Sequence, residues 1–284
     1  MHSAITPMNI LDTMRDLEHE QVMFCQDKDT ELKAIIAIHH TGLGPALGGT
    51  RMWNYASDAE ALNDVLRLSR GMTYKSSLAG LNLGGGKAVI IGDAKTIKTE
   101  ALLRRFGRFI QNLGGKYITA EDVSMNSKDM SVIRMETPHV CGLPENQGGS
   151  GDPSPVTAYG VYVSMKAAAK SRWSNESLQG KHILVQGLGN VGASLLDHLH
   201  KEGAKLFIND INSEREALMA KRFQATVIPA SQLWDKEYDI YAPCALGATL
   251  NDESIQKLKC ERSEEHTSEL QSRQYLVCRL LLEK

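Results

Sequence analysis

Short apolar runs alternate with polar, turn-forming segments along the whole chain, and this pattern predicts an α/β fold. In the first half, residues 32–38 and 88–91 form apolar or β-branched runs that are typical of buried strands. The second half repeats such runs at regular intervals, with helical patterns between them, over residues 182–186, 205–209, 225–228 and 238–242. Because strands that alternate with helices form parallel sheets, we expect a parallel α/β sheet in this half.

A helix is predicted between the two strands of the first half. Ser57 and Glu60 have the spacing of a capping box, which satisfies free amides at the start of a helix. The apolar residues that follow at helical spacing are Ala61, Leu62, Val65, Leu66 and Met72. We therefore expect a helix that carries Lys75 at its C-terminal end.

Composition and charge exclude several classes of function. The formal net charge is -2, and the basic residues form no stripe along the chain. We therefore expect a small-molecule partner rather than nucleic acid or an anionic membrane. No apolar run approaches the roughly 20 residues of a membrane-spanning helix, and the N-terminus lacks a signal-peptide pattern, so we expect a cytoplasmic protein. Scattered, unpaired cysteines indicate reduced thiols rather than a zinc site, and no metal is expected.

A glycine motif in the second half predicts a dinucleotide site. Gly187, Gly189 and Gly192 have the G-x-G-x-x-G spacing after a strand and before a helix, where a pyrophosphate can approach the helix N-terminus. Asp210 follows at the end of the next strand, where a carboxylate can bind the adenosine ribose hydroxyls. We therefore expect NAD rather than NADP.

The residues beyond the strand at 238–242 are a further candidate for the dinucleotide site. Cys244 and Ala245 follow that strand directly, and ligands of open α/β sheets bind beyond the carboxyl ends of strands. The alternative is an ordinary loop.

Two lysines and an aspartate are candidates for the chemistry. Lys87 follows three glycines, which leave its ammonium accessible to a substrate. Lys75 is a second lysine nearby, and two cations in one desolvated pocket disfavour each other's charged form, so that one would be a neutral base. Asp122 follows a strand predicted at residues 117–119. Each residue alone is more typical of a solvated surface, and only their combination indicates a site.

Several long segments resemble one enzyme family. The segments Gly-Met-Thr-Tyr-Lys, Leu-Asn-Leu-Gly-Gly-Gly-Lys, Thr-Ala-Glu-Asp-Val and Tyr-Ala-Pro-Cys-Ala-Leu-Gly-Ala are similar to the glutamate, leucine, phenylalanine and valine dehydrogenases, and the likeness runs from about residue 42 to 260. Within that family the leucine branch is the most similar. The resemblance implies an N-terminal mixed α/β domain for substrate binding and oligomerisation over residues 1–150. A Rossmann-type parallel-sheet domain that binds NAD would follow over residues 151–261, after the Gly-, Ser- and Pro-rich hinge at residues 148–155.

The resemblance also implies roles for individual residues. Lys75 would hold the substrate carboxylate, Lys87 would activate water, and Asp122 would move protons to and from the amino nitrogen. Further residues expected to bind substrate are Leu47, Gly48, Gly49, Met72 and Ala120. Those expected to bind the cofactor are Thr157, Gly187, Gly189, Asn190, Val191, Gly192, Asp210, Cys244 and Ala245. The implied reaction is the reversible NAD-dependent oxidative deamination of an L-amino acid by a homo-oligomeric enzyme.

Leu47 is informative about the substrate. The glutamate branch has a lysine before its Gly-Gly pair to bind the distal carboxylate, whereas this chain has Leu47 before Gly48 and Gly49. The distal carboxylate of an acidic substrate would have no charged partner next to Leu47. This favours a substrate with an aliphatic side chain, such as leucine, isoleucine or valine. Open alternatives are a core position for Leu47, the phenylalanine or valine branch, another NAD dehydrogenase on the same fold, and an NAD-binding remnant without catalysis.

The C-terminal segment departs from the family. Residues 262–272 back-translate directly to a sequencing-library adapter, and residues 276–284 to its continuation after a short index. We interpret residues 262–284 as a non-native tail and expect native sequence only up to about Glu261. The nucleotide sheet would then lack its last strand or strands next to residues 238–242, leaving an unpaired edge, and the printed chain would be inactive and prone to aggregate.

Overall fold

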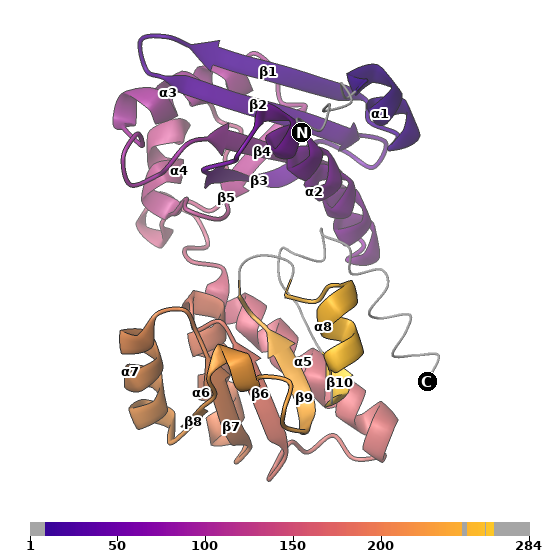
Figure 1. Ribbon diagram of the computed structural model, residues 1–284. Helices are drawn as coiled ribbons and strands as arrows, with labels where there is room; N and C mark the ends of the chain where they lie inside the picture. Colours follow the sequence, from indigo (N-terminus) through magenta and orange to yellow (C-terminus); the bar gives the residue numbers. More distant parts are fainter. Residues whose placement is uncertain (1–8, 246–248, 259, 264–284) are drawn as a thin grey trace, which may run out of the picture. The chain divides into compact units, whose positions relative to one another are not determined.

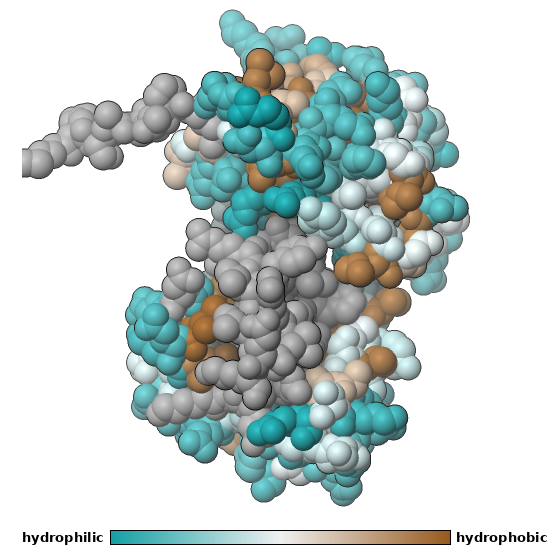
Figure 2. Space-filling view, turned by 90° about the vertical axis from the view of Figure 1, so that its right-hand side faces the viewer, coloured by the Kyte–Doolittle hydropathy of each residue, from teal (hydrophilic) through white to brown (hydrophobic). Residues whose placement is uncertain are grey.

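The computed structural model describes residues 9–245, 249–258 and 260–263, which fall into two compact units, Met1–Asp152 and Pro153–Lys284. This division lies two residues beyond the boundary that we placed after residue 150. No helix in the described part of the chain combines the length and apolar character needed to cross a membrane. On the face shown in Figure 2, the first unit is mostly hydrophilic, with hydrophobic side chains in small patches.

The first unit is built on a five-stranded mixed sheet in the order β1-β2-β4-β3-β5. The strands are β1 (Gln21–Asp27), β2 (Leu32–His40), β3 (Ala46–Trp53), β4 (Gly84–Ile91) and β5 (Tyr117–Glu121). Strand β2 is antiparallel to β1 and β4, whereas β3 is parallel to both β4 and β5. One face packs against α2 (Asp58–Leu78) and the other against α3 (Glu100–Gln111) and α4 (Ser127–Arg134), with α1 (Ile10–Asp16) near the N-terminus (Figure 1).

Helix α2 forms where the apolar spacing predicted it. The Ser57 hydroxyl accepts the Glu60 amide at 3.1 Å, but the Glu60 carboxylate accepts the amide of Ala56 rather than that of Ser57. Only half of the predicted capping box is therefore present. The apolar residues from Ala61 to Leu66 are buried, and Lys75 lies in the last turn, as expected.

Strand β4 begins at Gly84, four residues before the run that predicted it. Its glycines are buried because neighbouring backbone comes very close: a Cβ atom on Gly85 would lie 2.2 Å from the Thr73 amide nitrogen of α2. The glycines therefore serve close packing, and they do not leave the Lys87 ammonium exposed as we expected, because its side chain is buried.

The second unit holds a five-stranded parallel sheet in the order β10-β9-β6-β7-β8, which confirms the predicted fold class. Its strands are β6 (His182–Gln186), β7 (Lys205–Asn209), β8 (Thr226–Val227), β9 (Tyr238–Pro243) and β10 (Cys260–Ser263). Its helices are α5 (Ser154–Trp173), α6 (Asn190–Lys201), α7 (Ser213–Phe223) and α8 (Asp252–Lys257), with a short 3-10 turn at Ala230–Gln232; another such turn, Glu145–Gln147, lies in the first unit. Strands β6 and β7 have the predicted bounds because their apolar runs are buried in a parallel sheet.

The expectation that no strand lies next to β9 is wrong. Strand β10 pairs with it in parallel, with Cys260 opposite Tyr238 and Ser263 opposite Tyr241. Strand pairing uses backbone amides and carbonyls, so Arg262 and Ser263 can complete the ladder although we assign them to the non-native tail. The rest of that tail, residues 264–284, lies outside the described residues.

Replacing Gly85 by alanine should destabilise the first unit by ~3 kcal/mol or more, because the clash is with backbone that cannot rotate away. Gly80→Ala is the matched control: its site has open space and a φ of +67°, so only the left-handed strain of about 1 kcal/mol is expected. Denaturant unfolding of both variants measures the difference. Equal losses would show that the approach of α2 to β4 is not tight.

Candidate active site

The sheet register brings Lys87 and Asp122 together from two strands that flank β3. Val89 of β4 packs into the apolar cluster under α2, and Lys87, two residues earlier, projects on the same side of the strand. Asp122 follows Glu121, the last residue of β5. Because β3 is parallel to both neighbours and lies between them, these side chains meet over its centre.

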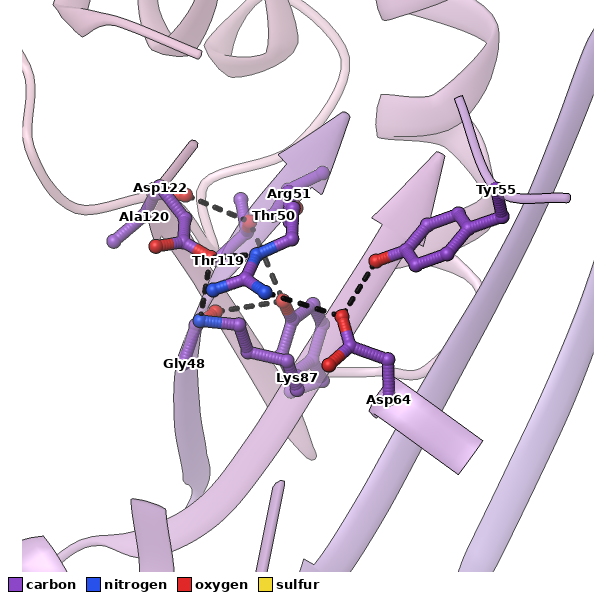
Figure 3. A network of polar contacts seen from close by, with 10 residues as sticks. Gly48, Thr50, Arg51, Tyr55, Asp64, Lys87, Thr119, Ala120 and Asp122 are labelled. Carbon is purple, nitrogen blue, oxygen red and sulfur yellow. Dashed lines mark hydrogen bonds and ion pairs between the residues drawn. The ribbon is translucent and has the colours of Figure 1, made fainter. Parts of the chain in front are cut away.

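Lys87 and Asp122 form a buried ion pair. The Lys87 Nζ lies 2.8 Å from Asp122 Oδ2, and the two side chains are only 2% and 7% exposed. Arg51 of β3 donates from Nε to the same oxygen at 3.1 Å (Figure 3). One carboxylate oxygen thus holds two cations, and charge-assisted contacts of this kind are needed to keep a buried carboxylate ionised.

The surroundings shift the pKa values of both partners. Burial lowers the pKa of Lys87, Asp122 opposes that effect, and the Arg51 cation adds to it. Burial alone would raise the pKa of Asp122, but Lys87 and Arg51 outweigh it and lower the pKa to about 2. Asp122 therefore stays a carboxylate while Lys87 releases its proton more readily than an exposed lysine. The cation with the largest effect on the pKa of Lys87 is Arg51, whereas the sequence had suggested Lys75.

Lys75 lies beside this pair, half-buried in the last turn of α2. Burial lowers its pKa, and the Asp122 carboxylate opposes that effect. Among the residues that the structure describes, no carboxylate lies within ion-pair distance of Lys75. A half-buried ammonium without a salt bridge is suited to bind an anionic group of a ligand.

Some of the predicted substrate residues lie close to the ion pair. A Cβ atom on Gly49 would lie 2.9 Å from the Asp122 Cβ, and one on Gly48 would lie 3.3 Å from the Met72 side chain. Ala120 stands opposite Gly49 in the ladder and is half-buried. Leu47 is also half-buried and is absent from the fully buried core among the described residues. The structure thus places Gly49 next to Asp122 and Gly48 next to Met72, and the substrate-binding roles of these residues stay predictions.

Three residues of this network were missed in the sequence. Arg51 Nη1 lies 3.2 Å from Oδ2 of Asp64, which also accepts a hydrogen bond from the Tyr55 hydroxyl at 2.6 Å (Figure 3). Strand β3 was not predicted because glycines interrupt its apolar pattern. Had it been, its period of two would have placed Arg51 on the same face as Leu47 and Gly49.

The glycine motif of the second unit forms a tight turn between β6 and α6. Gly187 has a φ of +92°, and a Cβ atom on it would lie 2.4 Å from the Ala245 amide nitrogen. A Cβ atom on Gly192 would lie 2.0 Å from the Gly187 carbonyl oxygen and 3.5 Å from the Cys244 Cβ. The motif and the segment after β9 are therefore neighbours, as the sequence predicted.

The start of α6 has the features of a phosphate site. Gly189 is its N-cap without a side-chain cap, so the amides of Asn190 and Val191 in the first turn have no side-chain acceptor there. A Cβ atom on Gly189 would meet nothing within 4 Å. Uncapped amides that face open space fit the pyrophosphate of a dinucleotide.

Asp210 connects this loop to the end of β7. Its Oδ2 accepts the Leu188 amide at 2.6 Å and its Oδ1 accepts the Asn212 amide at 2.8 Å. The carboxylate keeps further lone pairs for ribose hydroxyls. A groove of about 390 Å³, lined in part by Leu188, Gly189 and Asn212, lies alongside. Thr157 lies near the start of α5, half-buried. These residues fit NAD.

Comparisons with known proteins agree over most of the chain. Residues 19–139 match the Glu/Leu/Phe/Val dehydrogenase dimerisation domain, and residues 148–212 match the Glutamate/Leucine/Phenylalanine/Valine dehydrogenase domain. The leucine dehydrogenase of Thermoactinomyces intermedius is 56% identical over 254 residues, which cover 89% of this chain and 69% of that protein. The L-tryptophan dehydrogenase of Nostoc punctiforme is 46% identical over 89% of this chain and 71% of its own length.

Solved structures show the same relationship. The crystal structure of the L-tryptophan dehydrogenase from Nostoc punctiforme aligns with a TM-score of 0.73 and 41% identity, over 96% of this chain and 78% of that one. A glutamate dehydrogenase structure from Thermus thermophilus aligns with a TM-score of 0.77 at 19% identity, over 96% and 77%, and shares the fold. The chain belongs to the glutamate, leucine, phenylalanine and valine dehydrogenase family.

Proposed function

We propose that this chain catalyses the reversible, NAD-dependent oxidative deamination of a branched-chain L-amino acid in the cytoplasm. The observation that carries the proposal is the buried Lys87–Asp122 pair with the unpaired Lys75 beside it. The products would be the 2-oxo acid, ammonia and NADH. We propose leucine as the substrate, because a similar protein is named leucine dehydrogenase, and isoleucine and valine as further substrates.

The charges of the site suit an α-amino acid. Arg51 forms salt bridges with Asp64 and Asp122, and Lys87 forms one with Asp122, whereas Lys75 has none among the described residues. The substrate carboxylate would balance the remaining charge by binding Lys75. Asp122, which stays ionised, would accept a hydrogen bond from the substrate amino group.

The chemistry needs one group that takes a proton and one that passes it on. NAD bound to the second unit would supply the acceptor for the α-carbon hydride. Asp122 would take a proton from the substrate ammonium group, so that loss of the hydride leaves an iminium. Neutral Lys87 then takes a proton from the water that adds to the iminium carbon. Asp122 would return the proton that it took to the nitrogen of this adduct, and the C–N bond would break as the adduct hydroxyl releases its proton to water, so that ammonia leaves.

The cofactor would be held by the second unit through the glycine motif and Asp210, with Thr157, Cys244 and Ala245 at the nicotinamide end. Backbone amides at the start of α6 would bind the pyrophosphate. We also propose that the first unit assembles into a homo-oligomer, because it matches a dimerisation domain.

Lys87→Ala should abolish turnover of L-leucine and leave NAD binding unchanged, because the residue belongs to the first unit. NADH absorbance measures turnover, and calorimetry measures NAD binding. Both are measured on a form in which residues from Arg262 on are replaced by the native continuation, because we expect the printed chain to be inactive. Burial of Lys87 lowers its pKa below the 10.5 of an ordinary lysine. The activity of the unsubstituted enzyme should therefore rise with pH, with the midpoint of this rise below pH 10.5. Turnover retained by the alanine variant would remove Lys87 as the base.

Gly189→Ala should weaken NAD binding by roughly tenfold or more without lowering the thermal stability of the second unit, because its methyl group would occupy the open space before the α6 amides. Gly192→Ala, whose methyl group would meet the Gly187 carbonyl, should lower both NAD binding and stability. Calorimetric titration and thermal unfolding measure the two effects. If NAD binds Gly189→Ala normally, the pyrophosphate lies elsewhere.

Leu47→Lys should raise kcat/KM for L-glutamate relative to L-leucine by roughly tenfold or more, because a lysine there would pair with the distal carboxylate. Leu47→Met keeps the size and adds no charge, so it should leave the ratio near its original value. Initial rates with both substrates test this. An unchanged ratio in the lysine variant would mean that Leu47 does not face the substrate side chain.

A further inference from the structure

Arg51 occupies a bridging position between two carboxylates that belong to different elements. Its Nε lies 3.1 Å from Asp122, beyond β5, and its Nη1 lies 3.2 Å from Asp64 on α2. The Arg51 side chain is 14% exposed and that of Asp64 is 21% exposed. The guanidinium is therefore held on two edges, and a planar fork of donors is suited to such a task where a single ammonium is not.

Asp64 is itself fixed from a third element. The Tyr55 hydroxyl, in the segment between β3 and α2, donates to the same oxygen that binds Arg51. A chain of contacts thus runs from Tyr55 through Asp64 and Arg51 to Asp122 and Lys87 (Figure 3). Only its last two members touch the proposed reaction, so the others act through them.

The charges in this chain act on Lys87 in opposite directions. The charged groups that face Lys87 are Asp122 after β5, Arg51 on β3 and Asp64 on α2. Arg51 disfavours the protonated lysine, whereas Asp64 and Asp122 favour it. Lys75 on α2 interacts with Asp122.

We propose that Arg51, anchored by Asp64, is a positioning residue of this site: it fixes the Asp122 carboxylate against Lys87 and places its own positive charge beside the Lys87 ammonium. This inference rests on the proposed deamination. It adds to it a residue on the central strand that touches neither substrate nor cofactor in the proposed reaction.

The test is the pH dependence of kcat for the oxidation of L-leucine in Arg51→Met and Asp64→Asn, both made in the form that carries the native continuation from residue 262 on. Loss of the Arg51 cation makes Lys87 easier to protonate, so the acidic limb should move to higher pH, with kcat at neutral pH falling on the order of 10²-fold. Asp64→Asn keeps an oxygen that can accept from Arg51 and Tyr55 but removes the charge, so its acidic limb should move to lower pH. Opposite shifts are not expected from a merely structural role.

Arg104→Met is the matched control for loss of an arginine. Arg104 pairs with Glu136 on the α3 side of the unit, where Arg108 also binds that carboxylate. Because Arg104 takes no part in the network around Lys87, the acidic limb of the Arg104→Met profile should stay at its original pH. Shifts of both variants in the same direction, or no shift in either, would overturn the proposal. If Arg51→Met fails to fold, the test rests on Asp64→Asn alone: a shift of its acidic limb to lower pH would support the proposal, and no shift would overturn it.

A second measurement separates this inference from the proposed function. In the intact chain labelled with ¹³C-lysine, the Lys87 Cε resonance, identified by its loss in Lys87→Arg, reports the titration of Lys87 without turnover. If no branched-chain amino acid is oxidised by the unsubstituted enzyme, the proposed function fails, whereas opposite shifts of this resonance in the two variants would still support the role of Arg51. An unshifted resonance in both would overturn it.

Discussion

The central interaction of the first unit is the buried ion pair between Lys87 and Asp122. Its surroundings keep the Asp122 carboxylate ionised and lower the pKa of Lys87. Removing Lys87 and Asp122 from water opposes the charge of each, and the pair persists because Arg51 adds a second cation to the carboxylate. The same cation makes the protonated lysine less favourable. A single arginine thus has opposite effects on two neighbours: it favours the ionised Asp122 carboxylate and disfavours the protonated Lys87 ammonium.

Glycine serves two different purposes in the two units. Around the ion pair, Gly49 and Gly85 allow backbones and side chains of adjacent elements to come closer than any Cβ atom would permit. In the second unit, Gly187 and Gly192 do the same within one turn, but Gly189 faces open space. The packing glycines define shape, and the open one leaves room for a ligand.

Sequence reasoning succeeded where a signal is local. Strands β6 and β7 are continuous apolar runs, and the glycine motif is recognised from the spacing of its own three glycines. It failed where the signal depends on contacts between distant segments: β3 carries glycines that only a neighbouring strand explains, and Arg51 is 71 residues from Asp122. It also failed at β10, because a strand can complete a ladder through its backbone whatever its side chains.

The shared register of β4, β3 and β5 restricts how this enzyme can vary. Lys87 and Asp122 meet only because each strand presents alternate residues to the same face. Insertion or deletion of one residue in any of the three would turn a reactive side chain toward the opposite face, where α3 packs. Changes in chain length are therefore confined to the connections between strands, while within the strands only substitutions can be tolerated.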